Sequence, residues 1–171
     1  MPSDAGLEAW KEHTSAFDRV RAVAETVKSP QSAAEIAAVA GVAENTARNH
    51  LERLVEMNVL LQDEKNRTAV YYPDPLHTRA QTLRELVDTH DQRALLELKS
   101  ELQSTIEGWQ STYAVDSPDA LRATAAETET VEETQTLRHT ANDWELIQYR
   151  LSIVEEAIRH YGAFTRDGVS A

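Results

Sequence analysis

The stretch "AGVAENTARNHLERLVEMNVL", residues 40–60, decides the fold. Ala47, Leu51 and Leu54 recur at spacings of four and three, which predicts a helix that begins near Glu44 and buries one face. Gly41 precedes this helix at a position where a left-handed backbone requires no Cβ, and Asn58 follows it with the second-best side chain for that conformation. The stretch therefore has the pattern of the turn and second helix of a helix-turn-helix.

The residues on either side complete a recognisable pattern. Apolar side chains recur every three or four positions from Phe17 to Val27, which predicts an amphipathic helix that ends before Pro30. "SAAE" places Ser32 at an N-cap and Glu35 three positions later, the capping box that opens a second helix. After residue 58, two β-like runs flank the polar turn "DEKNR" at 63–67. Two helices, a turn, a third helix and a β-hairpin predict a winged helix-turn-helix over residues 13–75.

Residues 76–164 are expected to be helical, with residues 1–12 and 165–171 as flexible ends. "VDSPD" at 115–119 interrupts this region, and Pro118 suits the first turn of a new helix. Two apolar seams with helical spacing remain, and we expect them to form a dimer interface between paired helices of two chains. An intramolecular hairpin, with 95–113 packed on 144–161, is the alternative, and the two arrangements are compatible with each other. The predicted interface residues are Leu95, Leu98, Leu102, Trp109, Trp144, Ile147, Leu151, Val154, Ile158 and Tyr161.

Composition excludes several classes of site. The 171 residues include no cysteine, which removes disulfides, thiolate metal sites and cysteine nucleophiles. No His pair has ligand spacing, no glycine-rich phosphate loop occurs, and G-x-S-x-G and H-E-x-x-H are absent. We therefore expect no catalytic residues, no metal site, no cofactor and no enzymatic activity. Apolar runs are only a few residues long and no secretion signal is visible, so a cytoplasmic protein without membrane contact is expected.

The charge is strongly acidic but unevenly distributed. The formal net charge is -12, and four lysines accompany thirteen arginines. Few lysines and many carboxylates are typical of proteins from salt-in halophiles, although an acidic mesophilic protein has a similar composition. Residues 28–72 hold five basic and six acidic side chains, so almost all the excess negative charge lies elsewhere.

The outer face of the helix near Glu44 carries side chains suited to reading DNA. In a helix-turn-helix this face enters the major groove. Arg48 has the geometry to pair with guanine, and Asn45 or Asn49 has the geometry to pair with adenine. Glu44 can accept a hydrogen bond from cytosine. Basic side chains in the hairpin turn suit a phosphate or the minor groove. The predicted DNA-binding residues are Ser32, Glu44, Asn45, Thr46, Arg48, Asn49, Arg53, Lys65, Asn66 and Arg67.

The sequence "SAAEIAAVAGVAENTARNHLERLVEMNVLLQDEKNRTAVYYP", residues 32–73, resembles the winged helix of ArsR-type transcriptional regulators of haloarchaea. "WQSTYAVDSPDALR" at 109–122 and Trp144 are similar to the C-terminal half of such regulators. The resemblance implies a dimeric DNA-binding transcription factor. It departs from the family at two points. Without cysteines, metal sensing does not carry over, and Ala43 replaces the expected Ser or Thr N-cap, at a cost of about 1 kcal/mol.

These observations predict a transcription regulator that binds a palindromic operator in double-stranded DNA as a homodimer. One alternative is a winged-helix adaptor that binds another protein. The other is a sensor in which the helical region holds a small effector, with Trp109, Tyr113, Trp144 and Tyr149 around the ligand.

Overall fold

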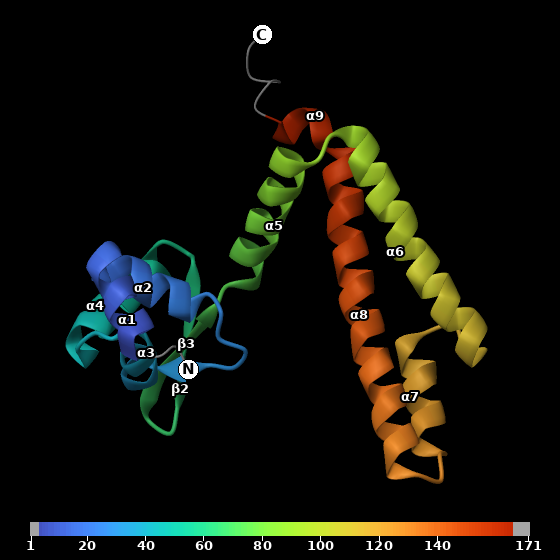
Figure 1. The fold of residues 1–171 in the computed structure, drawn as a ribbon, viewed down its shortest axis with the longest axis horizontal. Coiled ribbons are helices and arrows are strands. Elements are labelled where there is room, and N and C mark those ends of the chain that lie inside the picture. Colours follow the sequence, from blue (N-terminus) through green and yellow to red (C-terminus); the bar gives the residue numbers. More distant parts are fainter. Residues whose placement is uncertain (1–3, 166–171) are drawn as a thin grey trace. The chain divides into compact units, whose positions relative to one another are not determined.

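The computed structural model describes residues 4–165 of the chain, which are mainly helical with one small antiparallel sheet (Figure 1). The chain divides into two compact units, one up to Ala80 and one from Gln81 onward. The elements of the first are α1 (Asp4–His13), α2 (Ala16–Ala24), β1 (Gln31–Ser32), α3 (Ala33–Ala40), α4 (Glu44–Glu56), β2 (Leu60–Lys65) and β3 (Thr68–Pro73). Helix α5 (Pro75–Thr89) crosses the boundary, and the second unit continues with α6 (Gln92–Tyr113), α7 (Pro118–Ala126), α8 (Val131–Arg159) and α9 (Tyr161–Phe164).

The core of the first unit lies between α2, α3, α4 and the sheet. Leu51 and Leu54 of α4 are completely buried there, together with Ile36 of α3 and Val20 of α2. These are positions that the helical spacing predicted to face inward. Burying an aliphatic side chain of this size stabilises the fold by about 1.5–3 kcal/mol.

Local capping signals fix the ends of α3 and α4. The Ser32 hydroxyl accepts from the Glu35 amide, and the Glu35 carboxylate accepts from the Ser32 amide at 2.7 Å, which confirms the predicted capping box. Gly41 ends α3 with φ of +64°. Asn58 has φ of +58° after α4, where the Val59 amide donates to the Leu54 carbonyl at 2.9 Å and so satisfies an end of the helix.

Two features of this unit differ from expectation. Residues 1–12 were expected to be flexible, but Asp4–His13 form α1. Arg19 holds the end of this helix in place, because its Nη1 donates to the carbonyl of Thr14 at 2.6 Å and to that of Lys11 at 3.3 Å.

The sheet also has a strand that the sequence pattern did not predict. The strand order is β1-β3-β2, all antiparallel, with Gln31 opposite Tyr71 and Ser32 opposite Val70. A strand of two residues is too short to leave an alternation pattern, and its pairing with β3 is a long-range contact.

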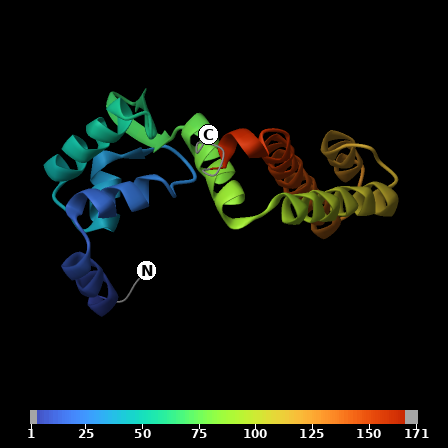
Figure 2. The same cartoon turned by 90° about the horizontal axis from the view of Figure 1, so that it is seen from above.

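The second unit packs α6 and α7 against α8 (Figures 1 and 2). The Ser117 hydroxyl caps α7 and Pro118 occupies its first turn, as predicted. One apolar cluster joins α5, α6, α8 and α9, and another joins α6, α7 and α8. Trp144 is completely buried in the second cluster.

The side chains assigned to a dimer interface pack inside one chain. Leu95, Leu102, Trp144 and Val154 are buried, and the other six residues of that prediction are half-buried against the same two clusters. The intramolecular alternative therefore describes this packing. Helical periodicity identifies the buried face of a helix but not the chain that covers it, and the predicted contact between two chains stays a prediction for the half-buried residues.

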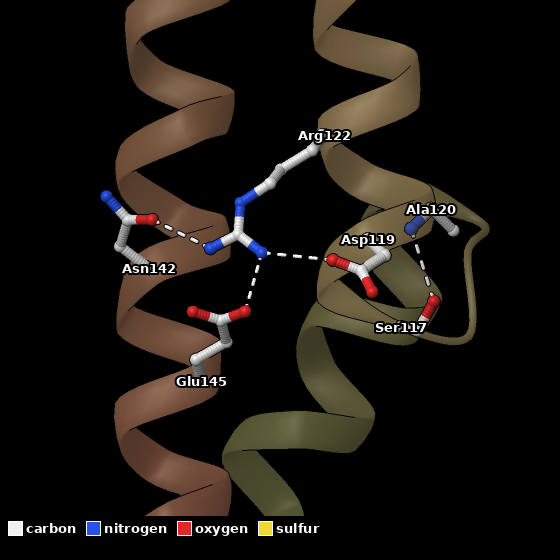
Figure 3. Close-up of polar contacts among 6 residues, drawn as sticks. All are labelled: Ser117, Asp119, Ala120, Arg122, Asn142 and Glu145. Atoms are coloured by element: carbon white, nitrogen blue, oxygen red, sulfur yellow. Dashed lines mark hydrogen bonds and ion pairs between the residues drawn. The ribbon is translucent and has the colours of Figure 1, made fainter.

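Polar contacts hold α7 on α8 (Figure 3). The Arg122 guanidinium donates to the carboxylate of Glu145 at 2.6 Å, to that of Asp119 at 3.1 Å and to the Asn142 amide oxygen at 2.8 Å. The hydrogen bond from Arg122 lowers the pKa of Glu145, while the bond to Glu145 raises the pKa of Arg122. The ionised pair therefore favours the docked position of α7.

Among residues 4–165, no helix is both long enough and apolar enough to cross a membrane.

Candidate nucleic-acid interface

The exposed face of α4 carries the polar side chains that the sequence pointed to. Ala47, Leu51 and Leu54 face the core, which leaves the opposite face of the helix in solvent. Near the start of α4, the exposed residues on this face are Glu44, Asn45, Arg48 and Asn49. As predicted, Ala43 provides no side-chain cap. The first amides of α4 are therefore left without a side-chain acceptor, and a phosphate could accept from them.

Arg48 is engaged by its own helix. Its Nη2 donates to Oε1 of Glu44, one turn earlier, at 2.6 Å, and both side chains are about half exposed. A base or phosphate that binds Arg48 through Nη2 must therefore compete with this carboxylate. Exposed pairs of this kind contribute about 0.3–0.5 kcal/mol, so the displacement is a small cost.

The other predicted DNA-binding residues of α4 and of the α3 N-cap differ in how far their side chains are exposed or already engaged. The Arg53 guanidinium carbon lies 5.4 Å from the centroid of the Phe17 ring on α2. Ser32 is half-buried with its hydroxyl in the capping box, and Thr46 is also half-buried.

The hairpin turn is tighter than expected. Residues 63–67 were expected to form the turn, but β2 continues through Lys65, which pairs with Thr68 of β3. Only Asn66 and Arg67 turn the chain, with φ of +52° and +63°. Positive φ at both central residues is the type I′ geometry, which matches the twist of the two strands. The turn presents three exposed side chains, Lys65, Asn66 and Arg67, which we call the hairpin tip.

A groove of about 410 Å³ lies between α4 and the hairpin. Glu44, Arg48 and Glu52 line it from the helix. Gln62 and Tyr71 are among the residues that line it from the strands, and Arg67 lines it from the turn. Burial, and then the nearby charge of Glu52, raises the pKa of Tyr71. Its hydroxyl therefore remains a hydrogen-bond donor at neutral pH. The groove presents both cationic and anionic groups along one wall.

Sequence reasoning missed Gln62, Thr68 and Tyr71, which line this groove. Their position depends on strand register, in which Gln62 lies opposite Tyr71. A register is fixed by the length of the turn. The short turn "NR" was the available signal, but it is much weaker than Asn-Gly.

The aromatic residues considered for an effector site do not form one group. Trp109 and Trp144 lie with ring centroids 5.9 Å apart, and Tyr113 packs against the same cluster. Tyr149 belongs to another face, where it is 47% exposed. Within residues 4–165, the Trp144 indole nitrogen is buried without a hydrogen-bond partner.

The part of the chain that the structure describes contains no group of three or more His, Asp or Glu side chains placed to hold a metal ion.

Two comparisons with known proteins bear on the chain. No curated protein matches it significantly. A family model described as "Family of unknown function (DUF7342)" matches residues 14–163, which span both units. The chain therefore belongs to the family of unknown function DUF7342.

Proposed function

We propose that this chain is a DNA-binding transcription regulator with an ArsR-type winged helix-turn-helix at residues 13–75. In this proposal it binds a palindromic operator as a homodimer, in the cytoplasm of a halophilic archaeon. The acidic composition with few lysines supports the halophilic part.

One observation carries the DNA-binding part. The exposed polar face of α4 and the cationic hairpin tip border the same groove, with Arg48 on the helix side and Arg67 on the strand side. A helix that enters the major groove and a hairpin that contacts the adjacent backbone require this combination.

The roles of the side chains follow from their chemistry. Arg48 would donate to guanine O6 and N7, and Asn45 or Asn49 would form a pair of hydrogen bonds with adenine. Glu44 would accept from cytosine or remain paired with Arg48. Lys65 and Arg67 would contact phosphates, which position the protein without reading sequence.

Selection from a random duplex library with the full chain, followed by fluorescence anisotropy, tests this proposal. Arg48→Ala should lose about 1–3 kcal/mol of discrimination at one operator position. Arg67→Ala should weaken binding to all sequences alike. Arg93→Ala, which removes an exposed arginine of α6, is the matched control and should change neither. Wild-type affinity of the Arg48→Ala protein for both operator and scrambled DNA would refute the base-reading assignment.

A second candidate is a winged-helix adaptor for another protein. The exposed apolar side chains of Val39 and Met57 in the first unit favour it. The double variant Arg48→Ala with Asn49→Ala would keep such a partner but lose an operator.

A third candidate is a sensor in which the second unit holds a small effector. The unpaired indole nitrogen of Trp144 favours this function, since a ligand acceptor would satisfy it. A rise in the unfolding temperature with a candidate ligand would support it.

A further inference from the structure

The second unit carries an apolar groove, separate from the candidate nucleic-acid interface, between the later part of α5 and the middle of α8. We call it the α5–α8 groove. Its volume is about 340 Å³. Its lining residues include Glu85, Leu86, Leu146, Tyr149, Arg150 and Ile153.

The groove exposes apolar surface that the chain's own packing does not cover. Leu146 is 64% exposed and Tyr149 is 47% exposed, at a spacing of three on α8. Ile153, four positions further, is almost completely buried at the edge of the same groove. Leu146 and Tyr149 follow a different face of α8 from Trp144, which packs on α6 and α7, while Ile153 also belongs to the apolar cluster of α5, α6, α8 and α9.

Helix α5 is also only partly covered. Of its fifteen residues, Leu86 and Val87 alone are buried. A helix of this length is marginal without tertiary packing. Further burial along the groove would stabilise α5 as well as cover Leu146.

The groove holds one charge of each sign that no neighbour neutralises. Within residues 4–165, neither the Glu85 carboxylate nor the Arg150 guanidinium has an ion-pair partner, although both line the groove. A surface with unpaired charges of both signs beside an apolar stripe is complementary to a copy of itself when the copy is related by a two-fold axis.

We propose that the α5–α8 groove is the homodimer interface and that each copy inserts the Leu146–Ile153 segment of α8 into the groove of the other. An antiparallel pairing with the two-fold axis between residues 149 and 150 places Leu146 opposite Ile153 of the second copy. It also places the Tyr149 ring opposite Arg150 of that copy, a cation–π pair that occurs twice by symmetry. The inserted segment brings Arg150 into the groove that holds Glu85 of the other copy.

This inference rests on the proposed function for its biological purpose, because a palindromic operator requires two recognition helices. The contact itself depends only on the groove. Its test is therefore made on the full chain without DNA.

Light scattering in concentrated potassium chloride measures the molar mass. The wild-type protein should have a molar mass of twice the chain mass of 19.1 kDa. Leu146→Glu places a carboxylate in the apolar part of the interface and should halve the mass, with the helical circular dichroism unchanged because the side chain is exposed in one chain. Leu96→Glu changes a leucine of α6 that is 51% exposed and lies outside the groove, so it should remain dimeric.

A second measurement does not depend on the fold of a charged variant. The chain has no cysteine, so Tyr149→Cys introduces a single thiol beside the proposed axis. Mild oxidation should link two copies through it, while Leu96→Cys should remain unlinked. This result decides the question if Leu146→Glu proves to be unfolded.

Several results would overturn the proposal. The wild-type protein could be monomeric, or the dimer could survive Leu146→Glu. Leu96→Glu could dissociate the dimer as fully as Leu146→Glu, or Leu96→Cys could cross-link as readily as Tyr149→Cys. A groove covered by another protein or by the chain's own residues would give the first of these. A wild-type dimer that binds no DNA would instead refute the proposed function alone. An operator-binding monomer would refute this inference and the homodimer part of the proposed function, but not its DNA-binding part.

Discussion

Arg19 is a buried charged residue of the first unit, and replacing it should loosen the turn before α4. Its side chain is 8% exposed. Nε donates to the carbonyl of Ala40, at the end of α3, at 3.0 Å, in a buried hydrogen bond. Nη1 donates to the carbonyls of Thr14 and Lys11, in partly buried bonds. One guanidinium therefore joins α1, α2 and the end of α3.

The magnitude follows from these three bonds. Arg19→Met keeps much of the volume of the side chain but leaves the Ala40 carbonyl buried without a donor, at a cost of about 1–3 kcal/mol. The two partly buried carbonyls gain water instead, so each loses only about 0.5–1 kcal/mol. Removing the desolvation cost of the guanidinium offsets part of this loss. We expect a net destabilisation of about 2–3 kcal/mol.

Amide hydrogen exchange read by mass spectrometry measures this loss in the first unit separately from the second. Peptides from 33–56 should exchange about 30- to 150-fold faster, because 1.4 kcal/mol corresponds to a tenfold change. Arg21→Met is the matched control on the same helix. Arg21 forms a partly exposed pair with Glu25, worth at most about 1 kcal/mol. Equal exchange of the two variants in these peptides would refute the assigned role of Arg19.

Three further results are expected. Glu44→Gln should raise affinity for any duplex several-fold in anisotropy measurements, because it releases Arg48 and removes a carboxylate from the interface; unchanged or weaker binding would contradict this. Operator affinity should depend only weakly on potassium chloride concentration, or even rise with it, since residues 28–72 are nearly neutral and little counterion release is available. A steep loss of affinity in protein that circular dichroism shows to be folded would mean that phosphate neutralisation dominates. Finally, the contact with Arg122 lowers the pKa of Glu145 in the folded protein below the ordinary carboxyl value of 4.5. The stabilisation of the second unit by this contact is therefore fully present above pH 4.5, and it is lost as the pH falls through the lower folded pKa. Glu145→Gln should therefore flatten the acid dependence of α7 and α8 unfolding in that range, and an identical acid profile for the two proteins would exclude this contribution.

The sequence by itself determined the features that depend on neighbours along the chain. The capping box of Ser32 and Glu35, the left-handed Gly41 and the start of α7 at Pro118 each involve residues within a few positions of one another. Such contacts form inside a single turn, so their pattern is visible without the fold. The inward face of α4 was equally predictable, because helical spacing alone places Leu51 and Leu54 on one side.

Only the tertiary structure decided which surfaces meet. Strand β1 forms where Gln31 and Ser32, just before α3, pair with Tyr71 and Val70 of β3, and the groove residues depend on a register set by a two-residue turn. Arg19 has no local signal, since its acceptor on Ala40 lies 21 positions away. The seam through Trp144 and Val154 showed which side of α8 is buried, but periodicity carries no information about the covering partner. Burial inside one chain left Leu146 and Tyr149 exposed on α8, which follows from how α5, α6 and α7 pack around that helix.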